Sequence, residues 1–487
     1  MDIHSKKYLI KGIMSVISAF LHQFSIFPLF MMSNIMPFMT SYLYQIDKKS
    51  NPDKISNIRQ SDGYFIHPIM SLSMSLCCFF GGIVEHYLGP RLVLILGGIS
   101  IAAGDIFFIL SRSLIADFFI NIFFGIGFGI SMMAAVKNAS KYFPERRGLI
   151  NAIAGGFGGN LGSSSFNLVI KYFVSKGDYP NANDNYMYNE TTASNYKIFF
   201  GIHACVVFSF GLVASLLLMP YENAKNEIKD EKNTDIDNEY KNIENENNEV
   251  NNNGKNKNNN YKANLKIILK NMRIYYILLI FLFTSFLQGF ILTVGFNFGT
   301  MNHDNISNII SADQMSIIFM LMSLISCFIG PIFGMIYDKL GFKITIILIN
   351  IISMINGLLI FQTVRWSVIF YGFSIILNGC INSGAFSLIF PYVSKIFGFA
   401  YAGELYGIVV LSTGISSIIS SSTFYIIDKV VNSQNDKTYL IIFIVGVILN
   451  AIAGILTYNE KNEAFNINND ENMENEKEVT EINKNSI

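Results

Sequence analysis

The chain has 487 residues, of which 51% are hydrophobic and only 14% are charged, and its formal net charge is zero. Soluble domains carry about 25% charged residues, so this composition excludes an ordinary water-soluble enzyme, and the zero net charge excludes a basic nucleic-acid binder. All five cysteines fall in apolar stretches, which argues against a secreted disulfide framework. The composition indicates an integral membrane protein, and we expect no cofactor, no metal and no nucleic-acid partner.

Apolar runs long enough to cross a membrane recur along the chain. A helix needs about 20 apolar residues to span a hydrocarbon layer of about 30 Å, and these runs are continuous rather than alternating, which favours helices over barrel strands. We expect an all-α membrane protein with twelve transmembrane helices in two pseudo-symmetric six-helix bundles. The predicted spans lie near residues 12–42, 64–88, 91–112, 115–136, 148–173, 196–220, 272–300, 311–336, 342–364, 366–394, 402–427 and 438–458.

Two polar segments divide the chain into domains. The first, 222–261, holds ten Asp and Glu and six Lys. The second, 460–487, holds eight Asp and Glu and three Lys, and both segments are rich in Asn. Such segments contain too few apolar residues to fold on their own. We therefore predict an N-terminal six-helix bundle in 1–221, a disordered cytoplasmic linker in 222–261, a C-terminal six-helix bundle in 262–459 and a disordered cytoplasmic tail in 460–487.

The basic residues predict the orientation, because Lys and Arg collect in the cytoplasmic loops of membrane proteins. With both termini in the cytosol, the clusters Arg146–Arg147 and Lys262 to Arg273 fall on the inner side. We expect a monomeric, integral multi-pass protein of the plasma membrane or an organellar membrane, with both termini cytoplasmic and the lipid bilayer as its surroundings.

A glycine-based loop occurs twice, each time at the cytoplasmic end of the second span of a half. One copy runs from Gly82 to Arg91 and the other from Gly334 to Lys343. Each begins with a glycine, has a second glycine seven residues later (Gly89 and Gly341), and ends on a base two residues further on. The glycines allow a sharp reversal, and the base can hold the cytosolic face. The recurrence indicates that the two halves are related by an internal repeat.

These loops resemble the signature of the major facilitator superfamily, which has an acid four residues after its first glycine. Asp338 occupies that position in the second copy, whereas the first copy has His86 there and Glu85 one residue earlier. In the family this loop helps to latch the two halves together, so the resemblance implies gating roles for these residues. Because histidine changes its charge between pH 5 and 8, we also consider a latch in which His86 confers pH sensitivity, to be tested with His86→Asp.

A second stretch narrows the resemblance. Tyr142 and Phe143 are followed by Pro144, Glu145, Arg146, Arg147 and Gly148, and a run of glycines continues to Gly162. This pattern resembles the oxalate/formate antiporter and monocarboxylate transporter branch of the superfamily, over nearly all of residues 12–458. It implies a secondary active transporter that works by alternating access, as a symporter or antiporter, with a monocarboxylate-type anion as the leading substrate class. The structural motif that carries this resemblance is Pro144, Arg146, Arg147 and Gly148.

Polar residues inside the spans suggest where the substrate binds, since polar groups are costly in lipid and tend to face a cavity or a partner. They concentrate in the first, fourth, seventh and tenth spans, and in superfamily members these four helices line the central cavity. Asp105 and His203, in the third and sixth spans, are assigned structural roles. The predicted substrate-binding residues are His22, Gln23, Asn121, Gln288, Asn297, Asn378, Asn382 and Thr413.

The charge of the substrate stays open at this stage. A carboxylate favours a fixed cation, ideally arginine. Oxalate/formate antiporters that resemble this chain use an Arg in the eighth span and a Lys in the eleventh, but 311–336 contains neither and Thr413 lies near the place of the Lys. A dianion is therefore disfavoured. His22 is a candidate for carrying a co-transported proton. The alternatives are a carrier of a neutral polar metabolite and a non-transporting solute sensor; no motif of an intramembrane enzyme occurs.

Overall fold

The computed structural model of the chain describes residues 3–50, 58–143, 146–176, 178, 187–221, 265–300, 310–398, 401–431 and 436–460. Within these ranges every predicted span is helical. The linker predicted at 222–261 and the tail after Glu460 lie outside the described residues, so both remain predictions.

The first half opens with a broken helix. α1 ends at Ile26, a short 3-10 helix follows, and α2 continues to Ser50. Pro28 lies at the start of the 3-10 segment, where its missing N–H and fixed φ interrupt the α-helical ladder. The elements of this half are α1 (Ile3–Ile26), η1 (Phe27–Met31), α2 (Met32–Ser50), η2 (Gln60–Phe65), α3 (Ile66–Leu88), α4 (Pro90–Leu110), α5 (Leu114–Met132), α6 (Ala134–Tyr142), α7 (Arg147–Asn151), η4 (Ala152–Gly158), α8 (Gly159–Val169), η5 (Ile170–Ser175), α9 (Glu190–Ser194) and α10 (Tyr196–Leu217).

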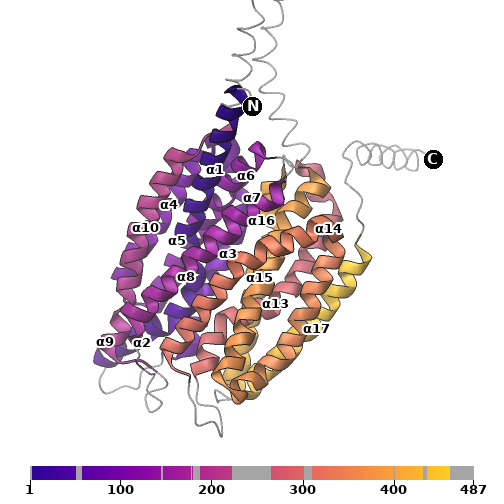
Figure 1. Cartoon of the computed structure of the whole chain (residues 1–487). Coiled ribbons are helices and arrows are strands. Elements are labelled where there is room, and N and C mark those ends of the chain that lie inside the picture. Colours follow the sequence, from indigo (N-terminus) through magenta and orange to yellow (C-terminus); the bar gives the residue numbers. More distant parts are fainter. Residues whose placement is uncertain are drawn as a thin grey trace, which may run out of the picture.

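The second half has longer helices. α14 covers the two predicted spans 311–336 and 342–364, which meet at a bend at Gly341. Figure 1 shows the helices of the first half on one side of the molecule and those of the second half on the other. The elements are α13 (Met272–Thr300), α14 (Ala312–Trp366), α15 (Val368–Phe397), α16 (Ala402–Val431) and α17 (Asp436–Asn459).

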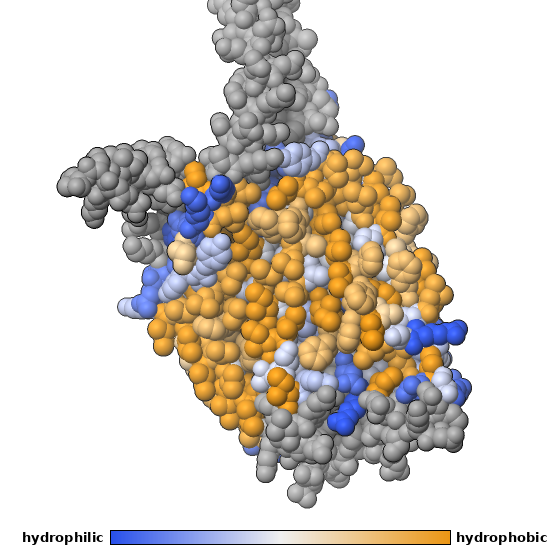
Figure 2. Space-filling view, turned by 180° about the vertical axis from the view of Figure 1, so that it is seen from behind, coloured by the Kyte–Doolittle hydropathy of each residue, from blue (hydrophilic) through white to orange (hydrophobic). Residues whose placement is uncertain are grey.

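The helices have the length and surface of membrane spans. Ten helices of the described residues are long and apolar enough to cross a membrane. One of these is α14, which contains two predicted spans, and the fifth predicted span is divided among α7, η4, α8 and η5. Large apolar side chains such as Leu110, Leu216 and Ile369 are exposed on the outside, and Figure 2 shows apolar side chains covering most of one face. A soluble monomer rarely exposes such a continuous apolar surface. The chain is an integral multi-pass membrane protein with about ten to twelve spanning helices.

The chain passes through the bundle so that the start of α1, the end of α10, the start of α13 and the end of α17 lie at one end (Figure 1). We call this the terminal end, and the other the opposite end. Two helix pairs join the halves: α3 packs along α16, and α8 packs along α14. Small residues permit the first of these contacts, because a Cβ added to Gly407 would lie 2.3 Å from the backbone nitrogen of Phe79.

The two glycine-based loops have the same geometry. Gly89 has φ 77° and Gly341 has φ 79°, a backbone region that side chains other than glycine rarely enter. The base that ends each loop then reaches the last turn of the sixth helix of its own half. Arg91 Nε donates to the carbonyl of Leu218 at 2.8 Å, and Lys343 Nζ donates to the carbonyl of Tyr458 at 3.1 Å. In both halves the loop base therefore caps a helix C-terminus, where a cation is favoured.

This cap can be tested with Arg91→Ala. We expect the variant to lose about 1 kcal/mol of stability, because a carbonyl at the end of α10 loses its cationic donor. Thermal unfolding of the purified protein would measure the loss, with Lys343→Ala as the equivalent change in the second half. Arg112→Ala is the control, since Arg112 is exposed at the opposite end; equal effects of the Arg91 and Arg112 variants would contradict the capping role.

Candidate functional site: a cavity between the halves

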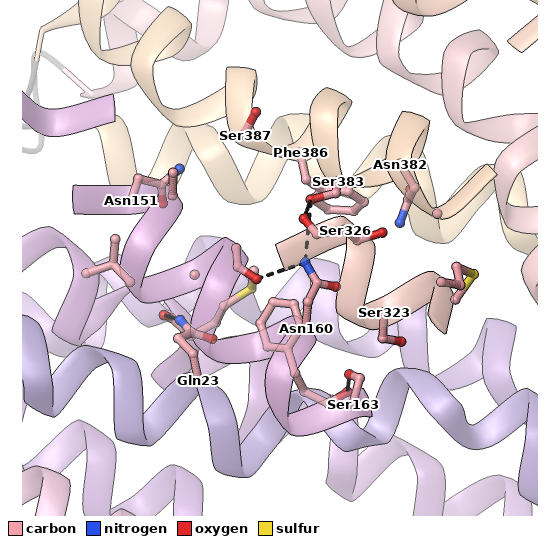
Figure 3. Close-up of a pocket in the computed structure, with 18 of the residues that line it drawn as sticks. Gln23, Asn151, Asn160, Ser163, Ser323, Ser326, Asn382, Ser383, Phe386 and Ser387 are labelled. Atoms are coloured by element: carbon pink, nitrogen blue, oxygen red, sulfur yellow. Dashed lines mark hydrogen bonds between the residues drawn. The ribbon is translucent and has the colours of Figure 1, made fainter. Parts of the chain in front are cut away.

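A cavity of about 100 Å³ lies between the two halves (Figure 3). Its wall combines residues of α1, η1, α5, α6, α7, η4 and α8 from the first half with residues of α13, α14, α15 and α16 from the second. The polar residues in the wall are Gln23, Asn151, Asn160, Ser163, Ser323, Ser326, Asn382, Ser383, Ser387 and Tyr406.

One wall is shaped by a π-helix. Residues Ala152–Gly158 form this wider helix inside the fifth span, and π-helical segments are frequent at functional sites. Gly155 and Gly156 line the cavity, and a Cβ added to Gly156 would meet no atom within 4 Å. By contrast, a Cβ at Gly158 or Gly162 would collide with the backbone of α1, at Phe20 and Phe24. The glycine run therefore serves two purposes. Gly158 and Gly162 allow the fifth span to pack against α1, and Gly155 and Gly156 have no side chain that would fill the cavity.

A hydrogen-bonded bridge crosses the cavity between the halves. Asn160 Nδ2 donates to the carbonyl of Gly156 at 2.8 Å and to Ser383 Oγ at 3.4 Å. Ser383 Oγ in turn donates to the carbonyl of Ser326 at 3.1 Å. In Figure 3 these bonds join α8 to α15 and α14, while the amides of Asn151 and Asn382 carry no bond to another residue drawn there. The wall thus offers amide and hydroxyl groups, each able to donate and accept hydrogen bonds.

The described lining of the cavity carries no charged side chain. The polar groups are amides and hydroxyls, and the rest are apolar side chains such as Phe27, Met322 and Phe386. This chemistry suits the hydrogen-bonding groups of a small uncharged solute, whereas a carboxylate would lose its hydration without gaining a cation.

Aromatic side chains of the two halves meet toward the opposite end. The ring of Phe38 lies 4.5 Å from that of Tyr188 and 6.5 Å from that of Phe296, between ring centroids. Two polar contacts join the halves nearby on the α8–α14 side: Ser164 Oγ donates to the carbonyl of Met320 at 3.2 Å, and Ser175 Oγ donates to Asp313 Oδ1 at 2.6 Å. The two halves are therefore in contact toward the opposite end as well.

A buried charged cluster joins the halves at the terminal end. Lys137 Nζ, on α6, lies 3.4 Å from Glu85 Oε2 on α3 and 4.0 Å from Glu404 Oε1 on α16. All three side chains are at least 91% buried. A Cβ added to Gly82 would lie 2.6 Å from Glu404 Oε1, so the first glycine of the loop motif makes room for the carboxylate of the other half. One lysine thus holds two acids from opposite halves together.

This cluster shows which residue of the first loop copy, Glu85 or His86, is buried. Glu85 is buried and faces the other half, whereas His86 is exposed, with its ring against that of Tyr87. In the second copy Asp338 is also exposed. The acid that shares Lys137 with Glu404 of the other half is therefore Glu85, which lies one residue before the acid position of the motif. The proposed pH sensitivity of His86 stays a prediction.

Of the predicted substrate-binding residues, two line the cavity: Gln23 and Asn382. Gln23 Nε2 also donates to the carbonyl of Met132 at 2.5 Å. The side chain of Asn297 lies outside the described residues. In the structural motif, Arg146 is exposed, Gly148 lies in α7, Pro144 lies outside the described residues, and so does the side chain of Arg147.

The other predicted residues are buried but lie away from the cavity wall. His22 lies in the first half beside the backbone of Ser131. Three of the other four donate a side-chain hydrogen bond to a backbone carbonyl, and the fourth, Gln288, supplies the backbone carbonyl that Asn378 bonds. Asn121 Nδ2 bonds Asp117 at 2.8 Å, Asn378 Nδ2 bonds Gln288 at 3.4 Å, and Thr413 Oγ1 bonds Val410 at 2.8 Å.

Several cavity residues were not among the predicted ones. Asn151, Asn160 and Ser163 come from the fifth span, and Ser326 and Ser383 come from the eighth and tenth. Their spacing was a usable signal: from 151 to 155 or 156, then to 160 and to 163, the steps are three to five positions, which places small and polar residues on one helix face. The predicted binding residues lay mainly on the first helix of each repeat, and the fifth span is not one of those helices.

Comparisons with known proteins agree with this architecture. The family model of the Major Facilitator Superfamily matches residues 19–421. No curated relative matches the sequence. Among solved structures, a D-xylose-proton symporter is 12% identical with a TM-score of 0.59, over 94% of this chain and 100% of that chain. The xylose transporter XylE from E. coli, in a partially occluded inward open conformation, is 14% identical with a TM-score of 0.59, over 91% and 99%.

A transporter of the POT family, in complex with 5-aminolevulinic acid, is similar as well. It is 14% identical with a TM-score of 0.60, over 92% of this chain and 96% of that chain. At these identities the likeness concerns the fold. The family match covers most of the chain, and it does not distinguish the oxalate/formate and monocarboxylate branch from the rest. The chain belongs to the major facilitator superfamily and is a secondary transporter of small solutes rather than an enzyme.

Proposed function

We propose that this transporter carries a small neutral polar solute by alternating access. The observation that supports this proposal is the cavity wall, whose described residues supply amides and hydroxyls but no charged group. The absence of a basic residue from the predicted eighth span, 311–336, points the same way. The halves meet at Phe38 on one side of the cavity and at Lys137 on the other, and alternating access would open these two contacts in turn.

A monocarboxylate is the second candidate, because the stretch from Tyr142 to Gly148 resembles that branch of the superfamily. In this case the cation would have to come from outside the cavity wall. The nearest buried one in the described residues, Lys137, already faces Glu85 and Glu404. We rank the neutral solute first for this reason.

Uptake into proteoliposomes tests the choice. The panel comprises labelled D-xylose, uridine and alanine against lactate, pyruvate and formate, each with and without an imposed pH gradient. We expect uptake or counterflow of at least one neutral solute above empty liposomes, and none of the anions. Saturable uptake of pyruvate or lactate alone would favour the monocarboxylate, and dependence on the pH gradient would show proton coupling.

The organisation of the rest of the chain is proposed from its sequence. The basic clusters place the terminal end in the cytosol, with the linker and tail on the same side. The two six-helix bundles, 1–221 and 262–459, are then the halves that rock against each other. Protease accessibility of the linker in sealed vesicles of known orientation tests this topology.

A further inference from the structure

A histidine–aspartate pair lies in the interior of the first half, away from the cavity. His203 on α10 and Asp105 on α4 are both fully buried, with His203 Nδ1 at 3.0 and 2.9 Å from the two carboxylate oxygens. Phe166 and Phe199 enclose the imidazole, the first edge-on at 5.2 Å and the second stacked at 6.1 Å. Neither member of the pair lines the cavity, so neither contacts a solute there.

The geometry fixes where the protons are. His203 Nε2 lies 3.1 Å from the carbonyl oxygen of Ser25 on α1. A carbonyl can only accept a hydrogen bond, so Nε2 carries a proton and donates it. Nδ1 faces the carboxyl group of Asp105 at 2.9 Å, and two acceptors cannot bond each other, so a second proton lies between Nδ1 and Asp105, and this hydrogen bond orients the ring. Asp105 therefore holds His203 in the orientation that binds α1.

Ser25 lies at the point where the first span breaks. α1 ends one residue later and the 3-10 segment begins, with Pro28 unable to donate a backbone hydrogen bond. A break of this kind leaves carbonyls that need other donors, which is costly inside a membrane. Two side chains supply them: His203 bonds Ser25, and Ser163 Oγ donates to the carbonyl of Phe27 at 3.0 Å.

The break also sets part of the cavity wall. Gln23 and Phe27, two residues to either side of Ser25, both line the cavity. We propose that His203, oriented by Asp105, is a positioning residue of the solute site: its bond to Ser25 fixes the break in the first span and with it the places of Gln23 and Phe27. The functional part of this inference rests on the cavity being the solute site.

Hydrogen–deuterium exchange of the full-length protein in nanodiscs, read by mass spectrometry, tests the inference without a solute. In His203→Leu we expect amides in peptides covering residues 20–32 to exchange at least tenfold faster, while peptides from α13 to α17 exchange as in wild type. In Asp105→Asn the amide can still hold the ring, so exchange over 20–32 stays within threefold of wild type. His203→Gln, which retains an N–H donor, is expected to restore most of the protection lost in His203→Leu.

Ser18→Ala is the matched control. Ser18 Oγ donates to the carbonyl of Ala214 at 2.6 Å, so this change also removes one buried bond between α1 and α10, two turns from the break. Local loosening of 20–32 in His203→Leu but not in Ser18→Ala supports the positioning role. Unchanged exchange, a uniform increase over the whole chain, or the same effect in both variants overturns it.

If His203→Leu fails to fold, the variants His203→Gln and Asp105→Asn decide the question. Exchange more than tenfold faster than wild type over residues 20–32 in both variants would likewise overturn the proposed orientation of the ring. Failure of every neutral solute in the uptake assay would affect the proposed function and leave this readout valid.

Discussion

Replacing Gly156 with leucine is expected to abolish transport and leave the fold intact. The Cβ of the new side chain would project into the cavity, because nothing lies within 4 Å of its position. A leucine then occupies space that a solute needs, in a cavity of about 100 Å³. Leucine is also a better helix former than glycine by up to about 1 kcal/mol, so stability is not expected to fall. Uptake of the solute identified in proteoliposomes should drop at least tenfold, and Gly156→Ala should have a smaller effect.

Gly454→Leu is the control for this change. Gly454 lies in α17, and a Cβ added there also meets nothing within 4 Å, but the residue does not line the cavity. Its variant should transport at the wild-type rate. If Gly156→Leu also transported normally while binding its solute with unchanged affinity, the cavity described above would not be the solute site.

Replacing Lys137 with methionine is expected to cause the largest loss of stability. The change leaves Glu85 and Glu404 buried between the halves without their cation. Breaking a buried ion pair by removing one partner costs about 3–5 kcal/mol, and here the two remaining acids also repel each other. Thermal unfolding should occur at a lower temperature. The contact between α3 and α16 should open at the terminal end, so a cysteine placed at Ser387, in the cavity wall, should react faster with a maleimide in a variant without native cysteines.

Two further variants separate charge from packing. Lys395→Met removes an exposed lysine near the same end and should change neither stability nor labelling. Combining Lys137→Met with Glu85→Gln and Glu404→Gln removes the uncompensated charges and should recover much of the lost stability. A lack of recovery would show that the aliphatic stem of Lys137, rather than its charge, carries the effect.

Much of the architecture could be predicted from the sequence because lipid imposes few choices. Apolar runs of about 20 residues must form helices there, so the predicted spans are confirmed as helical, and the family suggested by the loops from Gly82 and Gly334 is confirmed. The equal backbone angles at Gly89 and Gly341 agree with the repeat inferred from their spacing.

The candidate site was predicted only in part, and neighbouring residues show why. Gln23 faces the cavity while His22 lies beside Ser131 in the interior of the first half. Glu85 faces the other half while His86 is exposed. Adjacent residues on a helix point about 100° apart, so a small rotation of a helix exchanges their environments. Composition makes both members of each pair plausible and cannot choose between them.

The sequence by itself determined the membrane setting, the helical class, the positions of the spans and the superfamily, since each depends on apolar length or on local glycine and charge spacing. Tertiary structure decided which polar side chains meet in the cavity and which acid meets Lys137. Those outcomes depend on how far each helix is rotated, and close contacts between elements set that rotation, such as Gly158 and Gly162 against α1 and Gly407 against α3. Such contacts join residues far apart in the chain, and for that reason local sequence patterns do not reveal them.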